Sequence, residues 1–170
     1  IAGTSNAINI SDGLDGLATT LSILAFIGFA GISYLNNFTY IFDLSVIVIA
    51  ALIAFLVFNK KPAQVFMGDT GSLALGMGLG TLAYISKQEL YLLIFAVVPV
   101  IETISVILQV LSAKLSRKFL GKDIRPFKMA PLHHHFELSG FSETTVVIAF
   151  SLFQLVFLIG GLLFFLGFIH

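Results

Sequence analysis

The stretch NAINISDGLDG, at residues 6–16, leads directly into a long apolar run and forms the first of three polar clusters in this chain. The second cluster is NKKPAQVFMGDTGS at residues 59–72, and the third covers residues 114–143, with PLHHHFE at 131–137. Apolar runs with almost no charged residues separate these clusters. If the runs cross a bilayer, all three clusters emerge on the same face, which favours a composite active site at a membrane surface.

The composition indicates that this chain lies in a bilayer. Of its 170 residues 58% are hydrophobic and 11% are charged, and the mean hydropathy is +1.03. A soluble domain is only about half apolar, even when Gly is counted. The chain has no Cys, so it offers neither a disulfide nor a thiolate metal site. It also lacks a basic stripe, so we expect the lipid bilayer as a partner and no nucleic acid.

The apolar runs predict an all-α fold, a polytopic membrane bundle of about five transmembrane helices with the loops forming the site. A span needs ~20 apolar residues. We treat residues 1–170 as one membrane domain, and we expect Pro99 to bend its fourth helix. The predicted spans are near residues 17–35, 40–58, 70–86, 90–113 and 144–168.

The basic residues predict the orientation of the chain. Five spans place the two termini on opposite sides, and only Lys87 falls on the side of the C-terminus. Because cytoplasmic loops carry an excess of Lys and Arg, we expect the three clusters to face the cytoplasm and the C-terminus to lie outside. The basic residues on the cluster side are Lys60, Lys61, Lys114, Arg117, Lys118, Lys122, Arg125 and Lys128.

The first cluster pairs amides with carboxylates. Asn6 and Asn9 are three residues apart, as are Asp12 and Asp15, so on helical backbone each pair shares a face. Such a face could present amide and carboxylate groups together to one ligand. A capped helix entry is the structural alternative, but it needs only one of these residues.

The second cluster ends at the start of a predicted span. Gly68 permits a tight turn, and Asp69 is placed where a carboxylate could hold Mg²⁺ bound to phosphate. The alternative is a simple helix cap by Thr70 or Ser72. The local residues leave both interpretations open.

The third cluster contains three consecutive histidines, His133, His134 and His135. Neighbouring side chains on a helix point ~100° apart, so three in a row do not converge on one metal. We expect them to contact phosphate or sugar oxygens instead. For Glu102 and Gln154, which interrupt apolar runs, we favour a structural role through contacts with neighbouring helices.

Together these motifs resemble those of the polyprenyl-phosphate N-acetylhexosamine-1-phosphate transferases. The resemblance covers residues 6–18, FMGDTGS at 66–72 and PLHHHFE at 131–137, in that order along the chain. The triple His followed by Phe and Glu is similar to the members of that family that act on a muramoyl-pentapeptide nucleotide. The resemblance implies a multi-pass enzyme of the bacterial cytoplasmic membrane, with its active face in the cytoplasm.

The resemblance also implies the reaction and the residues for it. The phosphate of undecaprenyl phosphate would attack the sugar-side phosphorus of UDP-N-acetylmuramoyl-pentapeptide, giving lipid I and UMP with Mg²⁺ as cofactor. Asp69 would be the metal ligand, and Asp12 and His133 would share the catalytic work with it. The implied substrate-binding residues are Asn6, Asn9, Gly13, Leu14, Asp15, Asn59, Phe66, Gly68, His134 and His135, with Phe66 stacking on uracil.

Members of this family are longer and carry an upstream Asp-Asp motif and a Lys that this chain lacks. The chain also opens at Ile1 and not at Met. We therefore expect residues 1–170 to be the C-terminal half of the enzyme, inactive alone and completed by an N-terminal half. The sequence also leaves open a homodimer as a further assembly.

Two other functions stay open at this point. A sister transferase would use UDP-N-acetylglucosamine, although the His run weighs against it. A transporter fragment would use Glu102 and a broken fourth helix as an ion path, but it leaves the three one-sided clusters unexplained.

Overall fold

The computed structural model describes the backbone of residues 1–169 and the side chains of residues 1–167. Within those residues it is entirely helical, which confirms the predicted all-α class. The helices are α1 (Ala2–Ile10), α2 (Leu17–Leu35), α3 (Thr39–Asn59), α4 (Gly68–Ile85), α5 (Glu89–Phe95), α6 (Val97–Leu120), α7 (Leu132–Glu137) and α8 (Glu143–Ile169).

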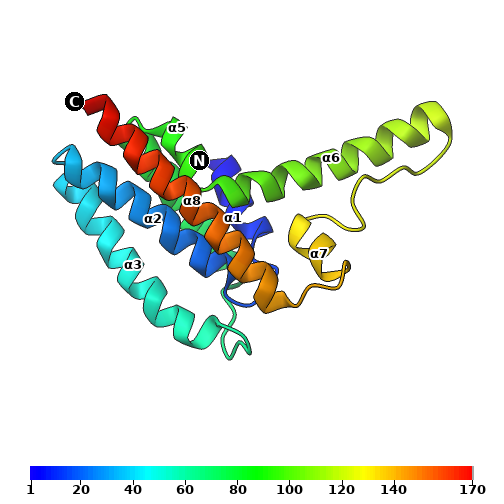
Figure 1. The fold of residues 1–170 in the computed structure, drawn as a ribbon, viewed down its shortest axis with the longest axis horizontal. Coiled ribbons are helices and arrows are strands. Elements are labelled where there is room, and N and C mark those ends of the chain that lie inside the picture. Colours follow the sequence, from blue (N-terminus) through cyan, green and yellow to red (C-terminus); the bar gives the residue numbers. More distant parts are fainter. Residues whose placement is uncertain (170) are drawn as a thin grey trace.

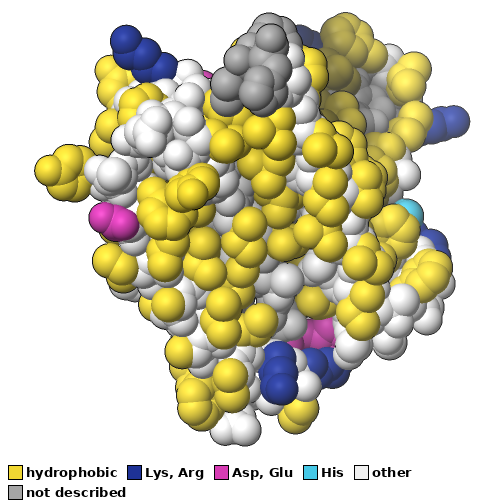
Figure 2. Space-filling model, turned by 60° about the vertical axis from the view of Figure 1, so that its left-hand side comes forward, with side chains coloured by type: hydrophobic (Ala, Val, Ile, Leu, Met, Phe, Trp, Pro, Cys, Tyr) yellow, Lys and Arg dark blue, Asp and Glu magenta, His cyan; other side chains and the backbone are white. Residues whose placement is uncertain are grey.

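The helices alternate in direction, as the spacing of the apolar runs predicts. In Figure 1 the start of α2, the end of α3, α7 and the start of α8 all lie toward one end of the bundle. The α2–α3 turn and the C-terminal end of α8 lie at the opposite end. Hydrophobic side chains cover the middle of the face shown in Figure 2, with charged side chains mainly at its margins. The first two polar clusters and the His run are therefore separated from the C-terminal end of α8 by the length of an apolar bundle.

Four of the described helices are long and apolar enough to cross a membrane, namely α2, α3, α6 and α8. Helix α4 forms where a span was predicted near residues 70–86, but it is not among these four. Its five glycines and Asp69 add little or no hydropathy, which explains the difference. The glycines serve close packing instead, because α4 lies directly against α1.

The predicted fourth span is divided into two helices. Helix α5 ends at Phe95 and α6 begins at Val97, with Ala96 at φ −115° and ψ 34° between them. Pro99 lies in the first turn of α6, where its missing N–H is tolerated, so the interruption falls three residues before it and not at it. Helix α6 then runs on to Leu120, so the loop predicted to begin at Lys114 begins only after that residue.

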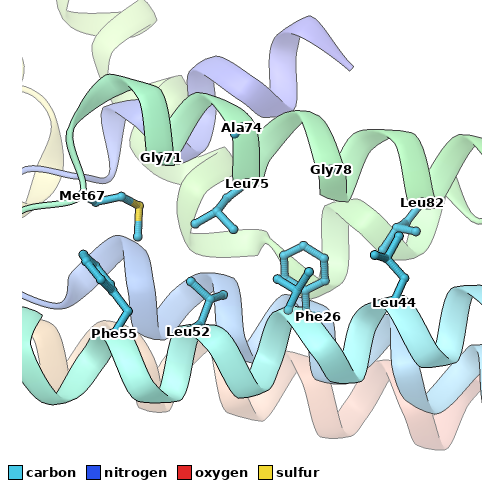
Figure 3. A pocket seen from close by; sticks show the side chains of 11 residues that line it. Phe26, Leu44, Leu52, Phe55, Met67, Gly71, Ala74, Leu75, Gly78 and Leu82 are labelled. Atoms are coloured by element: carbon cyan, nitrogen blue, oxygen red, sulfur yellow. The ribbon is translucent and has the colours of Figure 1, made fainter.

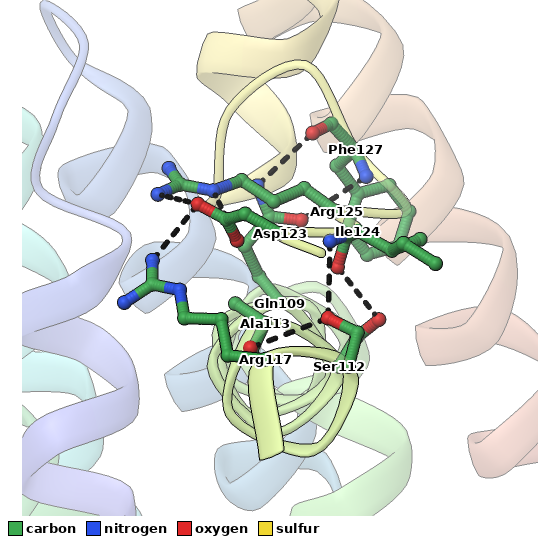
Figure 4. A network of polar contacts seen from close by, with 9 residues as sticks. Gln109, Ser112, Ala113, Arg117, Asp123, Ile124, Arg125 and Phe127 are labelled. Carbon is green, nitrogen blue, oxygen red and sulfur yellow. Dashed lines mark hydrogen bonds and ion pairs between the residues drawn. The ribbon is translucent and has the colours of Figure 1, made fainter. Parts of the chain in front are cut away.

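Helix α6 projects from the bundle, and the segment after it folds back along its surface (Figures 1 and 4). Gln109 donates through Nε2 to the carbonyl of Phe127 at 3.0 Å and accepts from the N–H of Phe127 at 3.1 Å. One turn further along, Ser112 donates to the carbonyl of Ile124 at 3.0 Å. Because residues three apart share a helix face, these bonds hold the returning segment against one side of α6.

A small ion-pair network closes the tip of this returning segment (Figure 4). Asp123 accepts from Arg117 at 2.8 Å and from Arg125 at 3.0 Å. Hydrogen bonds from Arg125 and Arg117 hold the pKa of the Asp123 carboxyl below its usual value. Two basic residues of the third cluster, Arg117 and Arg125, are thereby paired, although such exposed pairs each stabilise the fold only slightly.

Helix α2 is the centre of the bundle. It packs against both α3 and α8, and most of its side chains are buried. Phe29 meets the edge of Phe95 with ring centroids 5.7 Å apart, and Gly28 makes room for the same ring. Gln154 of α8 donates to the carbonyl of Leu21 at 2.6 Å, which confirms the predicted contact between helices.

Helices α3 and α4 leave an apolar groove between them, shown in Figure 3. Its volume is about 440 Å³. It runs from Phe55 and Met67, near the polar end of the bundle, to Leu44 and Leu82 further along the helices. The other lining residues are Phe26, Val48, Leu52, Gly71, Ala74, Leu75 and Gly78.

The contact between α1 and α4 depends on Gly76. A Cβ at this position would lie 2.5 Å from the carbonyl oxygen of Thr4 and 2.6 Å from the Cα of Ser5, both backbone atoms. Gly76→Ala should therefore destabilise the chain by about 1–3 kcal/mol, measured by thermal unfolding in detergent. Gly160→Ala is the matched control, because nothing lies within 4 Å of its Cβ, and it should leave stability unchanged or higher. Equal effects of the two substitutions would contradict the assigned contact.

Candidate active site

The first and second polar clusters meet through Asn9. This residue is in the last turn of α1, and its side-chain amide donates to Asp69 Oδ1 at 2.9 Å and to Ser72 Oγ at 3.0 Å. Ser72 in turn donates to the carbonyl of Gly68 at 3.0 Å. The alternative of a cap by Thr70 or Ser72 is not formed, because α4 begins after Met67 without a side-chain cap. The polar groups instead connect α1 to α4.

Asp12 lies beside Asp69 at this junction. It is in the turn at residues 11–16, which follows α1, and its carboxylate accepts the backbone N–H of Gly68. Gly68 has φ +63°, a conformation that favours glycine. Burial and the nearby charge of Asp69 raise the pKa of Asp12 to about 6, even though the Gly68 hydrogen bond lowers it. Two carboxylates are thus held close enough to repel each other.

Asp15 connects the same turn to two further segments. Its Oδ2 accepts the N–H of Ala63 at 3.0 Å, and its own N–H donates to Glu143 Oε1 at 2.7 Å. Glu143 also forms an ion pair with Lys61. Asp12 and Asp15 therefore point to different partners, and they do not share a helix face, because both lie after the end of α1.

Asn59 and Phe66 bracket the segment between α3 and α4. Asn59 is almost fully buried, and its side chain accepts from Thr19 Oγ1 at 2.6 Å and donates to the carbonyl of Val65 at 3.0 Å. The Phe66 side chain, by contrast, is 74% exposed. Asn59 thus braces this segment, and Phe66, three residues before Asp69 in the sequence, is exposed.

Two other predicted residues make their described contacts with groups other than the carboxylates. Asn6 donates to the carbonyl of Ala2 within its own helix, at 2.9 Å. Leu14 is buried in a small apolar cluster with Leu17 and Val98. That cluster anchors the turn of residues 11–16 to α2 and α6.

The third cluster reaches the same turn through His133. A Cβ added to Gly13 would lie 2.2 Å from His133 Nε2, so only glycine allows the imidazole to approach this closely. On its other side the ring faces Glu102, with Nδ1 3.3 Å from Oε2. Both side chains are buried.

The other two histidines have polar partners of their own, although the His134 ring also packs against the His133 ring, with centroids 4.3 Å apart. His134 Nδ1 is 2.8 Å from Glu137 Oε2, and His135 Nδ1 accepts the N–H of Lys128 at 3.1 Å. Each of the three imidazoles thus has a different partner. The His run is not a metal site in this arrangement.

The residues around Asp69 suit a divalent cation that is bound only in part by protein. No group of three or more His, Asp or Glu side chains able to hold a metal occurs in the described part of the chain. Asp12 and Asp69 nevertheless place two carboxylates together, and burial, with the charge of Asp69 as a second cause, raises the pKa of Asp12. Mg²⁺ commonly takes one or two protein carboxylates and fills its remaining positions with phosphate oxygens and water. This donor set fits such an ion.

Glu143, Lys61 and Glu102 are site residues that the sequence did not single out for this role. Glu143 is 128 residues from Asp15, and an acidic residue at the start of a helix is expected for the helix dipole alone. Lys61 was accounted for by membrane topology. Their roles depend on which segments meet, and no local pattern carries that information.

The two carboxylates predict a pH-dependent stability. The fold raises the pKa of Asp12 from 3.8 to about 6, so the native state holds this proton more tightly than the unfolded chain does. That contribution is complete below the unfolded pKa and is lost as pH rises through about 6. Asp12→Asn should therefore raise the Tm above that of the unchanged chain at about pH 7.5, with a smaller difference at about pH 4.5. A difference independent of pH, measured by thermal unfolding in detergent, would contradict the assigned repulsion.

Known proteins match this chain along most of its length. The family model described as glycosyl transferase family 4 matches residues 1–87. A relative from Staphylococcus saprophyticus is 52% identical over 161 residues, which are 95% of this chain and 47% of the relative. A relative from Halalkalibacterium halodurans is 50% identical over 92% of this chain and 46% of its own length. One from Thermotoga maritima is 48% identical over 92% of this chain and 49% of its own length.

All three relatives are named phospho-N-acetylmuramoyl-pentapeptide-transferase. The chain spans about half the length of each of them. The family model covers the first two polar clusters, where Asn9, Asp12 and Asp69 meet. The resemblance predicted from the motifs is confirmed, and the chain belongs to glycosyl transferase family 4.

Proposed function

We propose that this chain is half of a phospho-N-acetylmuramoyl-pentapeptide transferase, the half that carries Asp69 and the His run. The enzyme transfers phospho-N-acetylmuramoyl-pentapeptide from UDP to undecaprenyl phosphate, forming lipid I in peptidoglycan synthesis. The observation that carries the proposal is the meeting of Asn9, Asp12 and Asp69 at one end of an apolar helical bundle. Relatives with about 50% identity bear the name of this activity.

The reaction requires little covalent chemistry from the protein. An oxygen of the lipid phosphate forms a bond to the sugar-side phosphorus, while the bond from that phosphorus to the UMP phosphate breaks and UMP departs. Such transfers depend mainly on alignment and on neutralising phosphate charge. Asp69, with Asp12 beside it, would hold the Mg²⁺ that supplies this neutralisation. Asn9 fixes the Asp69 carboxylate through its hydrogen bond to Oδ1.

The nucleotide is assigned to the surface around the turn of residues 11–16. The exposed ring of Phe66 stacks on uracil, and the backbone at Gly13 and Asp15 forms the adjoining wall of the uridine pocket. Asn6 and the Asn9 amide lie toward the ribose and phosphates. The partly exposed His134 and His135 contact the sugar portion.

The lipid acceptor is assigned to the membrane side of the same end. The apolar groove between α3 and α4 begins at Met67 and Gly71, on either side of Asp69 in the sequence. An acceptor with a phosphate head and a long apolar tail suits a carboxylate site that adjoins such a groove. This arrangement supports a polyprenyl phosphate as the second substrate.

The orientation follows from charge. Eight of the nine basic residues lie on the side of the polar clusters, and only Lys87 lies on the other side. We place the clusters in the cytoplasm and the C-terminus outside the bacterial inner membrane. The nucleotide substrate and the catalytic face then share one compartment.

The activity belongs to the whole enzyme. Because the chain spans about half of its relatives, we propose that it is inactive alone and becomes active when joined to the other half. The test joins this chain to the part of the S. saprophyticus relative that it does not cover, referred to below as the completed enzyme. UMP and lipid I should form with the completed enzyme and not with this chain by itself. Activity of the isolated chain would contradict this division.

Asp69→Asn in the completed enzyme should reduce lipid I formation by about a hundredfold or more, because a metal ligand contributes several kcal/mol to the transition state. Membrane insertion should be unchanged. Asp43→Asn is the matched control, because Asp43 is exposed near the start of α3, at the opposite end of that helix, and its activity should stay normal.

Radiolabelled product analysis separates the substrates in the same assay. UDP-N-acetylmuramoyl-pentapeptide should give labelled lipid, and UDP-N-acetylglucosamine should not. Retained activity in Asp69→Asn would overturn the metal role. Labelled lipid from UDP-N-acetylglucosamine alone would assign the chain to the sister transferase.

A further inference from the structure

Glu102 is the carboxylate that the proposed chemistry leaves unassigned. It lies in α6, one of the helices able to cross a membrane, and its side chain is fully buried. Burying a carboxylate in such a helix is unfavourable unless it is paired. The described hydrogen bond and ion pair of this carboxylate both involve His133.

The Glu102 carboxylate contacts His133 at two points. Oε1 accepts the backbone N–H of His133 at 3.2 Å, and Oε2 lies 3.3 Å from the ring Nδ1. The first contact fixes the start of the short helix α7. Oε2 and Nδ1 are within ion-pair distance but outside hydrogen-bond geometry, and the His134 ring packs against the imidazole with centroids 4.3 Å apart. The carboxylate therefore positions the backbone of His133 and faces Nδ1 of its ring.

The opposite edge of the ring faces the turn of residues 11–16. His133 Nε2 is buried, has no hydrogen-bond partner within the described side chains, and lies where a Cβ of Gly13 would be. A carboxylate next to Nδ1 favours the imidazole form that carries its proton there. Nε2 is then the nitrogen with a free lone pair, directed at the turn that contains Asp12.

We propose that Glu102 is a positioning residue, which holds the His133 imidazole against the turn of residues 11–16 with its proton on Nδ1 and with Nε2 facing Gly13. The effect on turnover rests on the proposed function, whereas the position of the proton does not. Glu102 then acts through His133 and touches no substrate. The same contacts pair the buried carboxylate of α6 with His133.

Glu102→Gln in the completed enzyme is the first test. Its amide oxygen can still accept the His133 N–H, and its NH₂ group then faces Nδ1. We expect kcat to fall about 10–100-fold, as is typical when a carboxylate that orients a functional imidazole is lost, with the KM for the nucleotide changed little. Gln154→Met removes another fully buried polar side chain, one that contacts Leu21 and not His133, and it should leave kcat unchanged.

A double mutant distinguishes positioning from general packing. His133→Asn places a side-chain amide near the former position of Nδ1 and removes Nε2. If Glu102 acts through His133, adding Glu102→Gln to His133→Asn should reduce kcat no further. Independent, multiplied losses would overturn the proposal, and so would full kcat in Glu102→Gln. If Glu102→Gln does not fold, Glu102→Asp replaces it as the test. The shorter side chain moves the carboxylate away from His133 by one methylene, so kcat must also fall.

Nitrogen-15 spectra of the histidine-labelled completed protein test the pairing without any assay of activity. The protonated nitrogen of neutral His133, identified as the signal lost in His133→Asn, should be Nδ1. It should move to Nε2 in Glu102→Gln, because an NH₂ group cannot accept that proton. A proton on Nε2 in the unchanged protein would overturn the proposal. If no nucleotide yields UMP, the proposed function fails, and these spectra still decide the role of Glu102.

Discussion

The turn at residues 11–16 is the point on which the rest of the site depends. Asp12 and Asp15 in this turn, with Asn9 just before it, join α4, the segment after α3 and the start of α8. Gly13 adds α7 by admitting the His133 ring. Each partner comes from a distant part of the sequence, so the turn converts a bundle of apolar helices into one continuous polar surface. Its own position is fixed by Leu14 and Leu17 in the apolar cluster beneath.

The fold class could be predicted from the sequence because a membrane-spanning helix requires a long run of apolar residues. Long uncharged runs predict helices, and their alternation places the polar clusters at one end. Pro99 predicted a bend in the fourth span, and the span is indeed divided. The break lies at Ala96 and not at Pro99, because proline is tolerated in the first turn of a helix. The helical stretch after Lys114 could not be foreseen, because its charged residues read as loop and are stabilised by the segment folded back on α6.

The site was less predictable than the fold. The motifs contain Asp12, Asp69 and His133, together with Asn9 and Gly68, which contact the two aspartates. The carboxylate that faces His133 lies outside the motifs. Glu102 was predicted to contact a neighbouring helix, but its partner, His133, could not be named from the sequence. Asn59, which is predicted to bind substrate, also has polar contacts with Thr19 and Val65 that no local pattern indicated. Side chains that position others take part in long-range contacts, and these are set by tertiary packing.

The repulsion between Asp12 and Asp69 has a consequence for the order of binding. The fold brings Asp12 into a half-buried place beside Asp69, where burial and the charge of Asp69 make ionisation of Asp12 less favourable. A protonated Asp12 relieves the repulsion at low pH, and a cation relieves it at neutral pH. In the proposed enzyme, loss of the Asp12 proton and arrival of the metal would therefore be coupled, since each would favour the other. The proposed nucleotide substrate would bring further negative charge to the same place, so it would bind more favourably with its cation than without it.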